Sequence, residues 1–269
     1  MLRISGTGAT HVGLVRENNE DAGFIGPFCM LIADGVGGGA AGEVASATTA
    51  YVVSASAMTH QGEPPAGVLT DAVRQAQGQL ALGVEQDPDR GGMATTLTAL
   101  LTDGKTFALA HIGDSRGYVF RDDQLTRITT DHTYVQGLVD EGRLEENAMA
   151  THPWRNMVMR SVNGRPDEKA DVTPLSLAVG DRVLLATDGL TDMISEEWIT
   201  EILRRHDDDA AIEALIAAAL GCGGRDNVTC VLATIIDGPR VSADGILIGS
   251  VRDVHNIVDA AAVHRAKSA

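Results

Sequence analysis

Three aspartates share one local pattern, in which an apolar run of strand character ends at an aspartate beside a small residue. They are Asp34 in LIADG (31–35), Asp114 in HIGDS (111–115) and Asp188 in LLATDG (184–189). A fourth, Asp226 in GRDN (224–227), comes directly before another apolar run. One such aspartate is usually a turn or cap residue. Because apolar strands form the core, the ends of several strands are expected to cluster, and clustered carboxylates raise each other's pKa values unless cations neutralise them.

The residue types around these aspartates indicate which cations the site would take. Carboxylate and carbonyl oxygens favour Mg²⁺, Mn²⁺ or Ca²⁺ over Zn²⁺. Gly35 and Gly189 follow two of the aspartates and would let a backbone carbonyl or a water molecule come close. From the residues alone, the pattern predicts a carboxylate site for more than one divalent cation.

Arg16 precedes a further acidic pair, Glu20-Asp21, by four residues. A single arginine is most often a surface charge, but beside an anionic metal cluster its guanidinium suits bidentate capture of a phosphate. The histidines form no HExxH or paired motif. His111 is expected to be structural, whereas His132 and His152 flank an irregular segment and are candidates for a place near the site.

Two other interpretations are weaker. The segment GVGGGA (35–40) matches the dinucleotide pattern G-x-G-x-x-[GA], but Asp34 would face the pyrophosphate and no acidic residue follows about twenty positions later. Cys29, Cys222 and Cys230 form no C-x-x-C pair and no Cys-x5-Arg loop, which argues against zinc, disulfides and a thiolate phosphatase. All three are expected to be buried structural residues.

The elements that must position these residues form an α+β pattern. Apolar runs at 96–101 and 106–112 are separated by Asp103-Gly104, a hairpin signal, and runs at 117–121 and 125–128 by Asp122-Asp123. Short connections require antiparallel neighbours, which opposes a parallel doubly wound sheet. The other expected elements are strands at 22–25, 29–33, 158–161, 172–177, 182–186 and 228–236, and helices at 42–58, 67–84, 133–141, 196–205 and 210–220. Helix pairs inserted among hairpins predict an α+β layered fold.

The overall composition disfavours two classes of partner. The 269 residues carry a net charge of −16 at pH 7, and so acidic a surface repels nucleic acid and anionic membranes as well as aiding solubility. No run of about 18 apolar residues predicts a membrane-spanning helix, and the N-terminus lacks the apolar region of a secretory signal. Without a disulfide pattern, these features predict a cytoplasmic protein.

In their order and spacing, the motifs resemble the metal-dependent protein phosphatase family, the type 2C serine/threonine phosphatases, and most of all its compact bacterial members. The resemblance covers about residues 5–237 and rests on RxxNEDA (16–22), ADGxGG (33–38), GMATT (92–96), IGDSR (112–116), TDHT (130–133), ATDGL (186–190) and GRDNVT (224–229). It implies a four-layer α-β-β-α sandwich of two antiparallel sheets flanked by helix pairs. The catalytic domain would span 1–237, with a mobile flap at about 142–157.

The resemblance also implies a set of metal ligands. Asp34 would bridge two Mn²⁺ or Mg²⁺ ions, and the Gly35 carbonyl would bind one of them. Asp188 and Asp226 would complete the pair. Asp114, together with Asp188, would hold a weaker third ion.

The same resemblance implies hydrolysis of phosphoserine and phosphothreonine. A water bridging two ions attacks phosphorus, Glu20 acts through metal-bound water, and Arg16 holds the phosphate. The implied partners are phosphorylated proteins, among them a serine/threonine kinase whose action the phosphatase reverses. Many eukaryotic relatives carry a histidine directly after the Asp-Gly, where Val36 stands here. The leaving-group proton is therefore expected from another donor, such as a water on the third ion at Asp114.

Three alternatives fit part of this pattern. A catalytically dead, phosphoprotein-binding relative would usually have lost metal aspartates, and all four are present. A metal-dependent phosphomonoesterase with a small-molecule substrate is a second possibility, although the D-x-D-x-[TV] signature of the haloacid dehalogenase class is absent. A metal-binding structural or regulatory module would leave Arg16 unexplained.

Residues 238–269 differ in character from the rest of the chain. Apolar residues recur there at helical spacing: Leu247, Val251, Val254, Val258 and Ala261. The spacing predicts a C-terminal extension that forms a helix docked on the core, with a partner-binding helix as the alternative.

Overall fold

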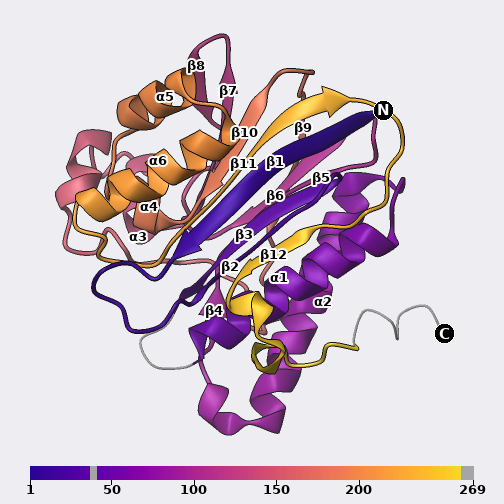
Figure 1. The fold of residues 1–269 in the computed structure, drawn as a ribbon. Coiled ribbons are helices and arrows are strands. Elements are labelled where there is room, and N and C mark those ends of the chain that lie inside the picture. Colours follow the sequence, from indigo (N-terminus) through magenta and orange to yellow (C-terminus); the bar gives the residue numbers. More distant parts are fainter. Residues whose placement is uncertain (37–40, 262–269) are drawn as a thin grey trace.

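The computed structural model describes residues 1–36 and 41–261. It consists of two antiparallel sheets packed face to face, with helices on the outer face of each (Figure 1). Most of the glycine-rich loop, at 37–40, and the last part of the extension, at 262–269, lie outside the described residues.

The first sheet joins strands that are distant in sequence. Its order is β1 (Leu2–His11), β11 (Val228–Asp237), β10 (Arg182–Ala186), β7 (Arg116–Arg121) and β8 (Gln124–Arg127). The second sheet has the order β12 (Ile246–Gly249), β2 (Asp21–Ile25), β3 (Cys29–Val36), β5 (Leu97–Thr102), β6 (Phe107–Ile112) and β9 (Asp171–Leu175), with β4 (Ala94–Thr95) paired to β3. Every strand pairing in the described residues is antiparallel, as the short connections predict.

Two helix pairs form the outer layers. α1 (Gly42–Thr59) and α2 (Pro65–Gln86) cover the second sheet, whereas α5 (Glu196–Arg205) and α6 (Asp208–Gly221) cover the first (Figure 1). The shorter elements are α3 (Tyr134–Asp140), α4 (Asp188–Thr191) and the 3-10 turns η1 (Pro88–Arg90), η2 (Glu146–Thr151), η3 (Ser250–Arg252) and η4 (Val254–Asn256). The four-layer α-β-β-α arrangement and the α+β class are therefore confirmed.

The core is divided among the three interfaces between layers. Met30, Ile32 and Leu185 are fully buried between the two sheets. Small and aliphatic side chains fill the spaces between each sheet and its helices. This packing fits a chain with only 3% aromatic residues, and it holds the ends of the central strands in fixed positions.

The extension does not form the expected helix. Residues 246–249 form strand β12, which pairs with β2, and two 3-10 turns follow it. Gly249 has a φ of 75°, which a right-handed helix does not accommodate, and the edge of β2 offers the backbone hydrogen-bond partners that β12 uses. Val251 packs into the core against α1, so the segment is docked there as a strand and turns.

Two further expectations need correction, and one strand was not expected. Residues 158–161 form no strand, because only isolated bridges, Thr133 with Val158 and Thr95 with Val162, flank them. Strand β1 was not predicted, since its run LRISGTGATH has few apolar residues. Cys222 is exposed at the end of α6, whereas the other two cysteines are buried as expected.

Candidate metal and phosphate site

Antiparallel pairing brings the predicted aspartates to one end of the sandwich. Asp34 lies near the end of β3, Asp114 in the turn from β6 to β7, Asp188 just after β10, and Asp226 just before β11. The pKa of Asp34 is raised well above its usual value, first by burial and then by the charges of four carboxylates: Asp21, Asp188, Asp114 and Asp226. Charges act on this pKa only over short distances, so these carboxylates lie close to Asp34. The structure thus gathers all four predicted aspartates around one centre.

Close backbone contacts at this end require glycine. A Cβ atom at Gly189 would lie 1.9 Å from the carbonyl oxygen of Asn227, and one at Gly35 would lie 2.5 Å from that of Gly42. Both separations are far below van der Waals contact, so no larger residue fits without moving backbone. Gly35 and Gly189, which follow Asp34 and Asp188, therefore allow the chain segments that carry these carboxylates to meet.

Hydroxyl groups fix the strand ends relative to one another. The Asp34 amide donates to Thr96 Oγ1 at 3.0 Å, and Thr95 Oγ1 donates to the Asp34 carbonyl at 2.8 Å. Thr96 Oγ1 also lies 2.8 Å from Ser115 Oγ. These contacts connect β3, the start of β5 and the turn at Asp114, and they explain the position of the GMATT motif beside the aspartates.

Burial dominates the electrostatics of the cluster. It raises the pKa of Asp114 to about 7, with Asp131 the next cause, and raises the pKa of Asp188 well above its usual range, with Asp114 the next cause. Among the described residues, no lysine or arginine hydrogen-bonds to Asp34 or Asp188. The ionised cluster therefore lacks a neutralising side chain at its centre.

Asp21 belongs to the same cluster, although the sequence indicated it only as the neighbour of Glu20. It is completely buried, and burial raises its pKa to about 7. One carboxylate oxygen accepts a hydrogen bond from Thr187 Oγ1 at 3.0 Å, while Oδ1 has no partner in the described part of the chain. Its pairing opposite Asp34 in the β2–β3 ladder was the signal that could have identified it.

Arg16 and Glu20 lie at the rim of the cluster. The Nη2 group of Arg16 donates to Asp226 Oδ2 at 2.7 Å, and 54% of the Arg16 side chain is exposed, so its other donors face outward. Burial raises the pKa of Glu20, and the charge of Glu43 is the next cause. The arginine is thus placed where an anion bound at the aspartates would meet it.

The carboxylates fit hard divalent cations better than any other group. Within residues 1–36 and 41–261, no three His, Cys, Asp or Glu side chains are close enough to form a coordination shell by themselves. Mg²⁺-like cations characteristically keep several waters in their shell, so they need few ligands from the protein. Buried, repelling oxygen ligands with an orphaned carboxylate oxygen are suited to such cations.

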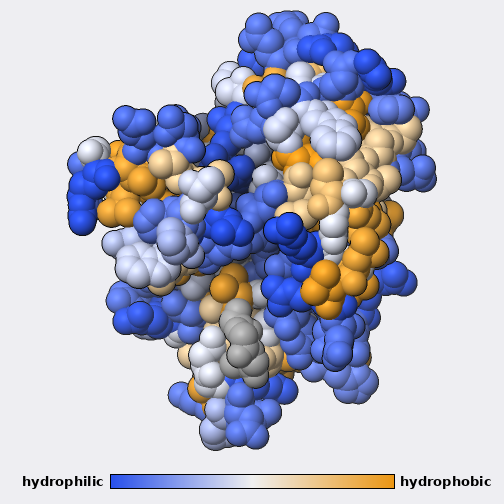
Figure 2. All heavy atoms as spheres, turned by 90° about the vertical axis from the view of Figure 1, so that its left-hand side faces the viewer, coloured by the Kyte–Doolittle hydropathy of each residue, from blue (hydrophilic) through white to orange (hydrophobic). Residues whose placement is uncertain are grey.

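A cleft of about 670 Å³ opens beside the cluster. Figure 2 shows this end of the molecule, where hydrophilic side chains surround a hollow between two lobes. Asp114, Asp188 and Asp226 lie in its wall, and so do residues of the irregular segment 142–157: Glu146, Met149, Ala150, Arg155 and Asn156. No histidine is among the described residues that line it.

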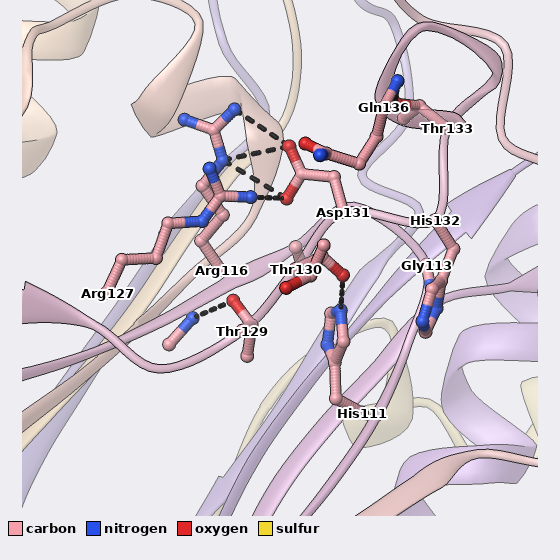
Figure 3. Close-up of polar contacts among 12 residues, drawn as sticks. His111, Gly113, Arg116, Arg127, Thr129, Thr130, Asp131, His132, Thr133 and Gln136 are labelled. Carbon is pink, nitrogen blue, oxygen red and sulfur yellow. Dashed lines mark hydrogen bonds and ion pairs between the residues drawn. The ribbon is translucent and has the colours of Figure 1, made fainter. Parts of the chain in front are cut away.

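A second aspartate centre, Asp131 of the TDHT motif, lies in the wall of the same cleft, and the sequence did not indicate its arginine partners. Asp131 accepts hydrogen bonds from Arg116 Nε at 3.1 Å and Nη2 at 2.8 Å, and a further one from Arg127 (Figure 3). Asp131 is only 5% exposed. These arginines come from β7 and β8, so the ion pairs hold the hairpin to the turn that carries Asp131.

The two histidines of this region have structural contacts. His111 lies 3.0 Å from the Thr130 carbonyl (Figure 3), and burial lowers its pKa to about 4, so it stays neutral, as expected. His132 accepts from the Gly113 amide at 3.1 Å and contacts Asp171 on its other nitrogen at 3.0 Å. It supports the turn before Asp114 and does not line the cleft, and His152 does not line it either.

Comparison with known proteins agrees with this geometry. The family model for protein phosphatase 2C matches residues 8–222. The chain belongs to the protein phosphatase 2C family. The serine/threonine protein phosphatase PstP of Mycobacterium tuberculosis is 45% identical over 89% of this chain, and serine/threonine phosphatase stp of Listeria innocua is 30% identical over 83%.

Solved structures of phosphatase 2C relatives share the fold. A crystal structure of M. tuberculosis PstP covers 87% of this chain and 100% of its own, with a TM-score of 0.80 and 41% identity. A second structure, of the PstP catalytic domain in complex with two manganese ions, has a TM-score of 0.79 over 88% of this chain and all of its own. This chain spans 46% of the length of full PstP and 92% of the L. innocua phosphatase.

Proposed function

We propose that this chain is a metal-dependent protein serine/threonine phosphatase that uses Mn²⁺ or Mg²⁺. The observation that carries this proposal is the buried cluster around Asp34 and Asp188, which has no cationic side chain at its centre. Such carboxylates ionise together only when cations neutralise them. Membership of the phosphatase 2C family and the two manganese ions in the PstP structure support the same assignment.

For the metal ligands we propose the set that the resemblance to the family implies. Asp34 would bridge two cations, the Gly35 carbonyl would bind one of them, and Asp188 and Asp226 would complete the pair. Asp114 would hold a weaker third cation together with Asp188. When bound, the cations would supply Lewis acidity and lower the pKa of a water molecule, which is the chemistry that phosphomonoester hydrolysis requires.

Two residues at the rim would act on substrate and solvent. Arg16 would bind the phosphate through the donors that it turns outward, since a guanidinium matches two phosphate oxygens at once. Its present partner Asp226 lies at the cluster, so the bound phosphate would be held directly over the carboxylate centre. Glu20 would act through water, as the resemblance to the family implies; its backbone amide donates to Asn227 Oδ1, and its carboxylate is half-buried beside α1.

The proton for the leaving alkoxide cannot come from the residue after Gly35. That residue is Val36, and no histidine is among the described residues that line the cleft. We propose that leaving-group protonation depends on Asp114, which lies in the cleft wall. Asp114→Asn should then slow hydrolysis of an alkyl phosphate such as phosphothreonine more than that of p-nitrophenyl phosphate, whose leaving group needs no proton. Equal rates for wild type and variant on phosphothreonine would exclude this role.

The substrate class proposed is phosphorylated protein. The cleft is open and bordered by residues 142–157, which we propose act as a mobile flap over an extended peptide. In this proposal the enzyme works in cytoplasmic signal transduction and reverses a serine/threonine kinase. No helix in residues 1–36 and 41–261 is long and apolar enough to cross a membrane.

The deciding experiment is phosphate release from a phosphothreonine peptide with Mn²⁺, with Mg²⁺ and with chelator. We expect metal-dependent release by the wild type and none by Asp34→Asn. A panel of metabolite phosphates, assayed in parallel, tests the small-molecule alternative. Metal binding without turnover on either panel would contradict the proposal and favour a phosphoprotein-binding protein.

A further inference from the structure

The C-terminal segment 246–260, named here the strap, crosses α1 after pairing with β2 (Figure 1, yellow). It lies beyond residue 222, where the match to the phosphatase 2C family model ends. Its first part, β12, lies directly beside the strand that begins at Asp21. The strap therefore contacts the strand that leads out of the carboxylate cluster.

The contact at the start of β2 is tight. Gly249 pairs opposite Ala22, and a Cβ atom at Gly249 would lie 2.2 Å from the carbonyl oxygen of Asp21. The positive φ of Gly249 then turns the chain inward, so that Ser250 and Val251 are both buried against α1. This geometry places a serine hydroxyl next to the first turns of α1.

A chain of hydrogen bonds runs from that hydroxyl to the cluster. Ser250 Oγ lies 2.9 Å from Ser46 Oγ, and Ser46 Oγ donates to the carbonyl of Glu20. Because the single hydroxyl proton of Ser46 is used there, Ser250 is the donor in the serine pair. The Glu20 carbonyl also accepts from the Gly35 amide at 3.2 Å. Ser46 and Glu20 thus connect Ser250 of the strap to Gly35.

The rest of the strap is anchored by contacts that do not join this chain. Tyr51 Oη donates to the carbonyl of Ala260 at 2.5 Å, farther along α1. Thr48 Oγ1 lies between the Asn256 carbonyl and the Val258 amide, at 3.2 Å from each. These anchors hold the strap on α1 but have no hydrogen-bonded connection to Glu20 within residues 1–36 and 41–261, which makes Tyr51 a matched control for Ser250.

We propose that the Ser250 hydroxyl is a positioning group for cation binding, acting through Ser46 and the Glu20 carbonyl on the peptide of Gly35. The inference rests on the proposed function, in which the Gly35 carbonyl is a metal ligand. Loss of the hydroxyl leaves Ser46 free to turn towards its second acceptor, the Glu43 carbonyl, at 3.3 Å. The Glu20 carbonyl then loses one of its two donors, and the Gly35 peptide is held less firmly.

The test measures Mn²⁺ binding by calorimetry on the metal-free 269-residue chain, together with phosphatase activity as a function of Mn²⁺ concentration. Ser250→Ala should weaken Mn²⁺ binding about 10-fold, the lower end of what losing an indirect metal partner costs. At saturating Mn²⁺ its kcat should stay within about 2-fold of wild type. Tyr51→Phe should bind Mn²⁺ like wild type, and Ser250→Thr, which keeps the hydroxyl, should recover most of the affinity.

The possible outcomes separate the positioning role from the phosphatase activity. Unchanged Mn²⁺ affinity in Ser250→Ala, or an equal loss in Tyr51→Phe, would overturn the positioning role while leaving the phosphatase proposal intact. A second result would also overturn the positioning role. In it, Ser250→Ala lowers both the unfolding temperature and the Mn²⁺ affinity, and Ser250→Thr restores the unfolding temperature but not the affinity. Absence of both Mn²⁺ binding and phosphate release in the wild type would instead overturn the proposed function, and this inference with it.

Discussion

Two groups of buried aspartates in this protein are compensated in opposite ways. Asp131 is bound by Arg116 and Arg127, and Asp181 is bound by Arg121. The hydrogen bond from Arg121 lowers the pKa of Asp181, whereas burial and neighbouring carboxylates raise that of Asp34. Arginines of the fold thus neutralise the aspartates of the first group, whereas the cluster around Asp34 needs bound cations for neutralisation.

The difference separates structural from functional carboxylates. A buried ion pair loses stability when one partner is removed, because the other charge remains buried. A cluster of like charges gains stability when one charge is removed or when a cation binds. Stability and activity should therefore respond in opposite directions to substitutions in the two groups.

The largest expected effect is on turnover in Asp34→Asn. Activity on a phosphothreonine peptide should fall by more than about 100-fold. Losing an indirect metal partner already costs up to about 100-fold, and Asp34 is proposed as a direct ligand. Thermal unfolding in chelator should show the variant at least as stable as wild type, since one repelling charge is gone. Asp181→Asn is the control, and it should keep Mn²⁺ binding. A comparable loss of turnover in this variant would contradict the division into structural and functional carboxylates.

Asp131→Asn should mainly destabilise the fold. Arg116 and Arg127 would lose their common partner, and breaking a buried pair costs about 3–5 kcal/mol in free energy of unfolding. Denaturant titration in chelator would measure this. Its Mn²⁺ affinity, determined at a temperature where it stays folded, should be close to that of wild type. A variant with normal stability and lost Mn²⁺ binding would place Asp131 in the functional group.

Arg16→Ala should affect substrate binding more than structure. A hydrogen bond to a charged group contributes about 1.5–3 kcal/mol, so KM for the phosphopeptide should rise about 10- to 100-fold. The ion pair with Asp226 is exposed and should contribute at most about 1 kcal/mol to stability. Steady-state kinetics at saturating Mn²⁺ is the measurement. An unchanged KM would remove Arg16 from the phosphate site.

The smallest expected effect is the pH dependence of metal-free protein. The folded-state pKa values of Asp21 and Asp114 are raised to about 7, so the folded protein binds protons more readily than the unfolded chain, and stability is lost as the pH rises through 7. Lowering the pH from 8 to 6 should raise the unfolding temperature by about 2–4 °C per group. Saturating Mn²⁺ should abolish the rise, and persistence of the full rise with Mn²⁺ would count against cation binding at the cluster.

The lowered pKa of Asp181 predicts the opposite trend. Its contribution is present above its unfolded pKa of about 4 and is lost only as the pH falls further. The two groups therefore differ in the pH range over which they affect stability. Asp114→Asn should reduce the rise between pH 8 and 6 without changing the loss of stability at lower pH.

Much of the fold was predictable because its signals are local. Hairpins at Asp103-Gly104 and Asp122-Asp123, and the apolar runs of β3, β10 and β11, indicated an antiparallel α+β layered fold with helix pairs, and the family resemblance added the division into two sheets. Strand β1 was missed because small and polar residues dilute its apolar pattern. The extension was misjudged because apolar residues at helical spacing also fit a strand followed by turns, and the open edge of β2 decided between them.

The sequence by itself indicated the residues of the candidate site: carboxylates at strand ends, glycines that permit close approach, and one arginine nearby. It could not determine which aspartates are compensated. The partners are far apart in the chain, as Arg16 is from Asp226 and Arg121 from Asp181, and burial, which sets the pKa shifts, is a property of the packed layers. Only the tertiary structure decided that Asp131 and Asp181 are satisfied from within and that the cluster around Asp34 is not.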